Sequence, residues 1–258
     1  TAVAEAVLLM ARASRRAAGR PVVLDSGLHP QCIEVALARC EALGIRALTA
    51  EPGAVEDGSA APGEQLLGAV LAHTTTRGAV QDLAGTIAAV HERGGLVAVD
   101  ADPLALTVLR EPGDVGADIA VGSAQRFGVP LFYGGPHPGF MAVADRLRRQ
   151  VPGRIVGVSR DSEGHEACRL ALQTREQHIR REKATSNICT AQALLAVVVA
   201  FYAVHHGPEG LRRIAHHAHA RAARIAAGIR DAGLDVEHES FFDTLSVVVP
   251  GAAERAVA

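Results

Sequence analysis

The stretch ADIAVGSAQRFGVPLFYGGPHPGFMAV, residues 117–143, decides the fold. An apolar run from Ile119 to Val121 predicts a buried strand, and a turn of small residues follows it. Gln125 and Arg126 come next, at the carboxyl end of that strand. A segment rich in glycine and proline then leads to a second apolar run, Phe140 to Val143. Ligands of open α/β sheets bind beyond the carboxyl ends of the strands, so we expect the functional site here.

Outward from this stretch, short apolar runs alternate with longer helical patterns. This alternation predicts an α/β fold with a mainly parallel, doubly wound sheet and right-handed crossovers. Strands are predicted at residues 21–24, 45–48, 66–72, 96–99, 119–121 and 140–143, helices at 2–18, 29–43 and 80–92, and an acidic surface loop at 51–64.

The pattern changes after Val143. Asn187 is a good N-cap for a long apolar helix that Gly207 and Pro208 break. We expect a large α/β domain over residues 1–200 and part of a smaller α+β domain over 201–258, both truncated. Around this boundary we predict a short helix at 145–150, irregular chain at 151–173, helices at 188–204 and 209–232, and strands at 234–237 and 244–249.

Composition bounds the class of protein. The 258 residues carry a formal net charge of −2, which gives no bias toward nucleic acid. The longest uncharged run, Ile188 to Val204, has polar breaks and falls short of a good membrane span. The four cysteines form no CxxC motif, so we expect buried thiols and a cytoplasmic location. No methionine opens the chain, and it ends shortly after a predicted strand, so we expect a fragment of a longer protein.

Asp100 ends a predicted strand, where a carboxylate can bind a cationic ring nitrogen, a hydroxyl or a metal. A turn or cap aspartate is the alternative, and spacing alone favours it. Pyridoxal-phosphate enzymes of the aspartate aminotransferase type place a ring-binding Asp and a Schiff-base Lys on nearby strand ends. Their separation along the chain is about that between Asp100 and Arg126. This spacing supports a functional role for Asp100.

Gln125-Arg126 therefore occupies the place of that lysine. Arginine keeps its proton and is no nucleophile toward an aldehyde. Arg126 could bind a phosphate or carboxylate through two hydrogen bonds, or it could form a buried structural ion pair, and the sequence leaves both open. The chain contains one lysine, Lys183, so any Schiff base in it has one candidate.

Four weaker features accompany these residues. His137 lies in the turn GGPHPG, where a structural role is the better interpretation than acid–base chemistry. Arg180 belongs to the charged stretch 174–183, which is either a solvated face or an anion-contact strip. The donors Thr185, Ser186 and Asn187 precede a predicted helix N-terminus, a fair anion site. The histidines at 205–206 and 216–219 lack a carboxylate or cysteine to complete a metal site.

At this point the sequence resembles one family, the P-protein of the glycine cleavage system, in its amino-terminal half. The residues that carry the resemblance are VGSAQRFGVPLFYGGPH at 121–137, PGRIVGV at 152–158, QTREQHIRREKATSNICT at 173–190, YAVHHGP at 202–208 and FFDTL at 241–245.

The resemblance implies a type I pyridoxal-phosphate-dependent transferase fold. It implies an enzyme that decarboxylates glycine and passes the aminomethyl group to the lipoyl arm of the H-protein. The family's carboxyl-terminal half carries His-Lys where this sequence has Gln125-Arg126, so the covalent anchor of pyridoxal phosphate is expected outside this chain. The implied partners are the catalytic half, the H-protein and glycine, in a dimer or heterotetramer, without nucleic acid or membrane.

We place no catalytic or metal-ligating residue in the chain. The residues expected near a pocket shared with the catalytic half are Asp100, Ser123, Gln125, Arg126, His137, Arg180, Thr185, Ser186 and Asn187. Two other hypotheses stay open: a scaffold that only stabilises the catalytic half and binds the H-protein, and a free-standing enzyme that uses Lys183.

Overall fold

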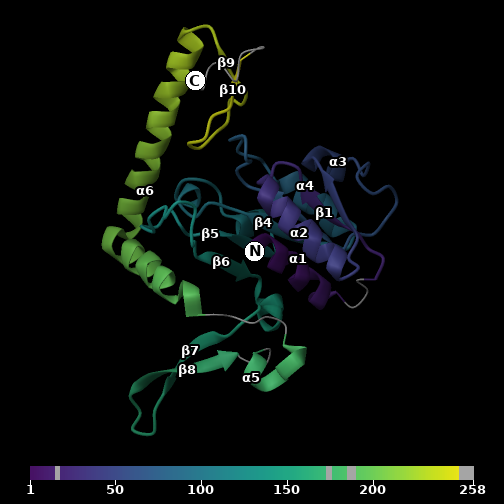
Figure 1. Cartoon of the computed structure of the whole chain (residues 1–258), viewed down its shortest axis with the longest axis vertical. Helices are drawn as coiled ribbons and strands as arrows, with labels where there is room; N and C mark the ends of the chain where they lie inside the picture. Colours follow the sequence, from purple (N-terminus) through teal and green to yellow (C-terminus); the bar gives the residue numbers. More distant parts are fainter. Residues whose placement is uncertain (15–17, 173–175, 185–189, 250–258) are drawn as a thin grey trace.

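A computed structural model describes residues 1–14, 18–172, 176–184 and 190–249. Its centre is a six-stranded sheet in the order β2-β1-β3-β4-β5-β6 (Figure 1). The first five strands are parallel, and β6 pairs antiparallel with β5 at the edge. The predicted mainly parallel sheet is therefore confirmed. The strands are β1 Val22–Asp25, β2 Ala47–Ala50, β3 Gly68–Ala72, β4 Leu96–Asp100, β5 Ile119–Ser123 and β6 Gly139–Val143.

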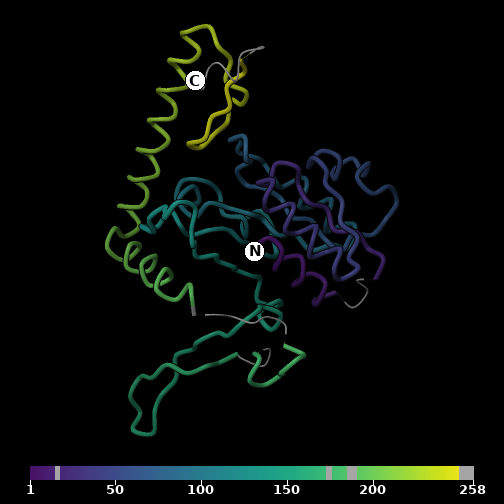
Figure 2. The backbone as a smooth tube through the Cα atoms, viewed as in Figure 1, coloured from purple at the N-terminus to yellow at the C-terminus, as the bar shows by residue number. Residues whose placement is uncertain are grey.

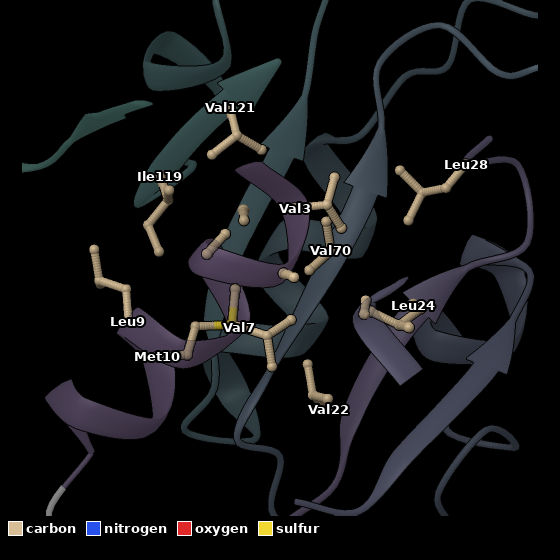
Figure 3. Packing of buried hydrophobic residues seen from close by; sticks show 14 of the residues in the cluster. Val3, Val7, Leu9, Met10, Val22, Leu24, Leu28, Val70, Ile119 and Val121 are labelled. Atoms are coloured by element: carbon tan, nitrogen blue, oxygen red, sulfur yellow. The ribbon is translucent and has the colours of Figure 1, made fainter. Parts of the chain in front are cut away.

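Helices cover both faces of the sheet, because its strands are apolar on both sides. In β3, Val70 and Ala72 face α1 (Ala2–Ala13) and α2 (Pro30–Ala42). The alternate residues of β3 face α3 (Pro52–Glu56) and α4 (Ala84–Glu92). Figure 3 shows side chains of α1 packed in one cluster with those of the sheet. Two apolar cores thus sandwich the sheet, as a doubly wound fold requires.

Several predicted boundaries in this domain are wrong. The first helix ends at Ala13 rather than at residue 18, because Ser14 is extended. On α2, the apolar side chains of Val35 and Leu37 are both exposed. α4 starts at Ala84 rather than at residue 80, because residues 79 and 80 form isolated β-bridges. The loop at 51–64 contains α3 and buries two of its side chains in the second core, so it is more than a surface loop.

Residues 151–173 were expected to be irregular, and this prediction is wrong. They contain an antiparallel hairpin of β7 (Ile155–Arg160) and β8 (Glu166–Leu172), which projects away from the sheet (Figure 1). Val156 and Val158 are exposed on it. No side chain of either strand is buried, so burial imposes no period-two apolar pattern that sequence inspection could detect. The segment at 145–150 is a short 3-10 helix, η3 (Asp145–Gln150).

A long helix, α6 (Ala193–Asp231), connects the sheet domain to the carboxyl-terminal segment (Figure 2). It starts five residues later than predicted, and the predicted N-cap Asn187 lies outside the described residues. The predicted break is confirmed at Gly207, which has φ 62° and ψ 177°. The last strands, β9 (Asp235–Val236) and β10 (Val247–Val248), pair antiparallel. A domain boundary between residues 200 and 201 stays a prediction.

The remaining short elements lie in the connections. They are the 3-10 helices η1 (Ala105–Thr107), η2 (Pro112–Val115), η4 (Arg181–Lys183) and η5 (Thr190–Gln192), and the helix α5 (Gln177–Arg180).

Gly68→Ala tests how tightly β3 packs. A Cβ on Gly68 would lie 2.2 Å from the Leu96 carbonyl oxygen and 2.6 Å from the Met10 sulfur. We expect this variant to lower the free energy of unfolding by about 3 kcal/mol, because backbone and buried core must both shift. Gly113→Ala is the control, since a Cβ there meets nothing within 4 Å. Denaturant unfolding of both variants measures the difference, and equal stabilities would contradict the packing.

Candidate functional site

A cavity of about 560 Å³ lies at the carboxyl ends of the parallel strands, where the sequence predicted the site. Its walls come from segments far apart in the chain. They are the start of α2 with His29 and Cys32, the loop after β3 with residues 74–76, the ends of β4 and β5, the turn at 137–139, and residues 242–244 of the carboxyl-terminal segment. The fold therefore gathers polar groups from separate segments around one hollow.

Asp100 is the last residue of β4 and lines this cavity. Its carboxylate has no hydrogen-bond or ion-pair partner within the residues that the structure describes. Burial raises the pKa of the Asp100 carboxyl to about 6, against a smaller lowering by the charge of the amino terminus. The Cys32 thiol is the neighbouring titratable group, and burial together with the charge of Asp100 raises its pKa. Burial thus disfavours the ionised form of the Asp100 carboxyl group, which lines the cavity.

Arg126 does not point freely at a ligand. Its Nη1 lies 2.7 Å from Asp102 Oδ2 and its Nη2 lies 2.5 Å from Asp243 Oδ2. Its guanidinium carbon also lies 5.5 Å from the centre of the Phe242 ring. Burial alone would lower the pKa of Arg126, but the hydrogen bonds and charges of the two aspartates raise it above its ordinary value. Of the two roles left open by the sequence, the structure shows the structural ion pair.

This ion pair joins two parts of the chain. Asp102 follows β4, whereas Asp243 and Phe242 belong to the carboxyl-terminal segment 117 residues beyond Arg126. We call Arg126, Asp102 and Asp243 the arginine bridge. It fastens the carboxyl-terminal segment to the end of the sheet, beside the cavity.

Ser123, Gln125 and His137 all line the cavity. The Gln125 side chain donates to the Val129 carbonyl oxygen at 2.5 Å, and this bond closes the turn after β5. The Ser123 hydroxyl accepts a bond from the Gln125 backbone N–H at 3.3 Å. His137 Nε2 is buried and has no hydrogen-bond partner among the described residues. His137 is therefore the second polar group of the cavity that lacks a partner.

Other predicted site residues lie elsewhere. Arg180 is on α5 and Lys183 on η4, both exposed, and neither lines the cavity. The expectation that Arg180 lies near a pocket shared with the catalytic half stays a prediction. Thr185, Ser186 and Asn187 lie outside the described residues.

Buried Asp25 organises the floor beside the cavity. Its Oδ1 accepts the Gly27 N–H at 2.7 Å, and its Oδ2 accepts the Ala72 N–H and the Gln81 amide at 2.9 and 2.8 Å. A Cβ on Gly27 would lie 2.7 Å from the Thr75 side-chain methyl group, so a larger residue there would force Thr75 to shift. These bonds hold the loop after β1 against the loop after β3.

Sequence inspection missed Asp102, Asp243 and the role of Asp25. Asp102 reads as a turn aspartate, and it does cap the Leu104 N–H at 2.8 Å. Asp243 lies in the FFDTL stretch, which carried the resemblance but no predicted contact. The available signal was that a buried arginine needs a carboxylate partner. Asp243 is so far from Arg126 along the chain that the sequence gave no reason to choose it.

The histidine groups and other metal candidates lie outside the cavity. The His206 ring meets the rings of His205 and Tyr202 edge-on, and His219 Nδ1 lies 2.8 Å from the Phe242 carbonyl oxygen. Asp161, Glu163 and His165 come together in the turn of the β7–β8 hairpin, all of them exposed. Exposed acidic groups of this kind are common without a metal.

Comparison with known proteins identifies the family. The family model described as "Glycine cleavage system P-protein" matches residues 1–258. Glycine dehydrogenase (decarboxylating) of Bradyrhizobium diazoefficiens is 56% identical over 247 residues, which are 96% of this chain and 25% of that relative. The relative of the same name from Jannaschia sp. is 53% identical over 258 residues, 100% of this chain and 27% of that relative.

A solved structure supports the same assignment. The crystal structure of an inhibitor-bound glycine decarboxylase (P-protein) of the glycine cleavage system superposes with a TM-score of 0.88 at 38% identity, covering 98% of this chain and 58% of that one. An aspartate aminotransferase from Thermus thermophilus has a TM-score of 0.63 at 18% identity, covering 98% and 67%, and shows the fold alone. The chain spans about a quarter of the length of the curated relatives. Over its whole length, this chain belongs to the glycine cleavage system P-protein family.

Proposed function

We propose that this chain serves a glycine dehydrogenase (decarboxylating) as part of its amino-terminal half, which supports the catalytic half without holding the cofactor covalently. The observation that carries the proposal is the family match over residues 1–258. The activity is the decarboxylation of glycine with transfer of the aminomethyl group to the lipoyl H-protein. Pyridoxal phosphate supplies the chemistry when bound, because its protonated ring accepts the electrons left by the departing carbon dioxide.

The cavity of this chain fits that cofactor only in part. Asp100 is the right group for a protonated pyridine nitrogen. Arg126 stands where the resemblance places the lysine and is engaged by two carboxylates. The phosphate finds no cradle either, since the backbone N–H groups of residues 26–28 and 75–76 are all bonded within the protein. We therefore propose that the catalytic half holds the cofactor and that the reaction does not take place in this cavity.

The partner half needs a surface on this chain, and α6 offers one. Leu194, Val197, Phe201 and Val204 lie at helical spacing on one face and are 71%, 48%, 71% and 80% exposed. We call these four residues the α6 strip. About three quarters of the relatives' length lies outside the region that this chain matches, and a part of it could cover the α6 strip. We propose that the catalytic half docks there.

By length and apolar composition alone, α6 would also pass as a helix able to cross a membrane. A single such helix is weak evidence, because helices that bury an apolar face against another protein pass the same test. Docking accounts for the four large apolar side chains that the α6 strip exposes on one face. A cytoplasmic location remains our proposal, supported by the free thiols of Cys32, Cys40 and Cys168, although Cys168 is exposed rather than buried.

The activity is tested on the full-length protein. We expect release of labelled carbon dioxide from carboxyl-labelled glycine, dependent on added lipoyl H-protein. Decarboxylation that does not depend on the H-protein, or no release from glycine at all, would contradict the proposed function. Separate Arg126→Met and Arg180→Met variants then address the scaffold hypothesis: full activity in both would mean that neither arginine serves the active site.

A further inference from the structure

The charge of the cavity is the starting point for one more inference. Its walls carry three carboxylates, Asp100, Asp102 and Asp243, against the guanidinium of Arg126 and the amino group of Thr1. Arg126 is shared between Asp102 and Asp243 at 2.7 and 2.5 Å. Asp100 is therefore the carboxylate that lacks a partner among the described residues. A carboxylate in a concave, partly desolvated position favours a cation strongly.

The same walls are poor at binding an anion. The Gly27 N–H donates to Asp25, the Leu28 N–H to the Asp25 carbonyl oxygen, and the Thr76 N–H to the Gly27 carbonyl oxygen. Pro30, the first residue of α2, has no N–H to offer. The backbone N–H donors of these two loops, which could otherwise cradle a phosphate or carboxylate, are thus used inside the protein.

We propose that this cavity binds a small organic cation with N–H donors, such as an amidinium or an ammonium, through the Asp100 carboxylate. His137 supplies the second polar contact, because its buried Nε2 has no partner among the described residues. A cavity of about 560 Å³ is the size of a small-molecule site. Nothing in the proposed glycine chemistry requires this site, so the inference stands or falls independently of that function.

The raised pKa of the Asp100 carboxyl supports the proposal. Desolvation raises it because the ionised form lacks stabilisation, and a bound cation would restore that stabilisation. The other groups facing Asp100 are the Cys32 thiol on α2 and the amino terminus at Thr1. The test is therefore run on protein whose Thr1 nitrogen is uncharged, acetylated or in peptide linkage, so that no amino terminus competes with the ligand.

Benzamidine and benzamide are matched probes, since they share a shape and differ in charge. Isothermal titration of the full-length protein is expected to give saturable benzamidine binding, with benzamide roughly tenfold weaker or worse. Asp100→Asn is expected to weaken benzamidine by about the same factor, whereas Asp161→Asn, on the exposed hairpin, leaves it unchanged.

Three results would overturn the cation site. They are equal affinity for benzamidine and benzamide, unchanged benzamidine affinity in Asp100→Asn, or no saturable binding of benzamidine. The comparison of the two probes uses the unmodified protein, so it decides the question even if Asp100→Asn fails to fold. The test measures ligand binding and does not depend on glycine decarboxylation. If benzamidine does not bind, the proposed function is unaffected.

Discussion

Arg126→Met is expected to lower the free energy of unfolding by about 3 kcal/mol, because it leaves Asp102 and Asp243 with no countercharge. Both carboxylates are mostly buried, at 18% and 20% side-chain exposure, so water cannot replace the guanidinium fully. The change also removes the contact with Phe242. Chemical denaturation measures the loss, and faster hydrogen exchange at residues 241–244 would locate it.

Arg148→Met is the matched control. Arg148 makes one exposed ion pair with Asp145, and its removal is expected to cost less than about 0.5 kcal/mol. Replacing all three members of the arginine bridge, as Arg126→Met with Asp102→Asn and Asp243→Asn, should recover part of the loss because no unpaired charge remains. If Arg126→Met were no more destabilised than Arg148→Met, the arginine bridge would not fasten the carboxyl-terminal segment.

Phe201→Glu is expected to weaken the contact between this chain and the catalytic half by about 3 kcal/mol, roughly a hundredfold in the equilibrium constant. The reason is that a charge would be buried at the centre of the α6 strip, where Phe201 is now 71% exposed. Sedimentation detects the dissociation if the halves are separate chains. In a single chain, the unfolding midpoint of the full-length protein falls.

The control lies on the same helix. Ile225 is 59% exposed but lies beyond the break at Gly207, outside the α6 strip. Ile225→Glu should leave both sedimentation and the unfolding midpoint unchanged. Equal effects of Phe201→Glu and Ile225→Glu would show that the α6 strip has no special role in docking.

The sheet domain could be predicted because its signals are local. Apolar runs ended by polar residues fixed every strand of the central sheet to within a few residues, and the carboxyl ends of those strands located the cavity. The β7–β8 hairpin was missed because neither of its faces is buried, so burial imposed no apolar alternation on Val156 and its neighbours. An apolar pattern arises where one face of an element is buried, and an exposed hairpin has no such face.

The position of the site in the fold could be predicted from the sequence, but the contacts between its side chains could not. Asp100, Ser123 and Arg126 line the cavity at the carboxyl ends of the strands. The pairing of Arg126 with Asp243 could not be predicted, because a contact across 117 residues depends on where α6 returns the chain. The same long-range packing decides whether an arginine is open to a ligand or closed by carboxylates, and no local pattern records it.

The most direct measurement of the central claim is the site of cofactor attachment. Sodium borohydride fixes pyridoxal phosphate to the lysine that holds it, and peptide mapping by mass spectrometry then identifies that lysine in the full-length protein. Lys183 is the one lysine of this chain, and it lies exposed on η4, away from the cavity. We expect the label on a lysine outside residues 1–258 and none on Lys183. A stoichiometric label on Lys183 would contradict the account.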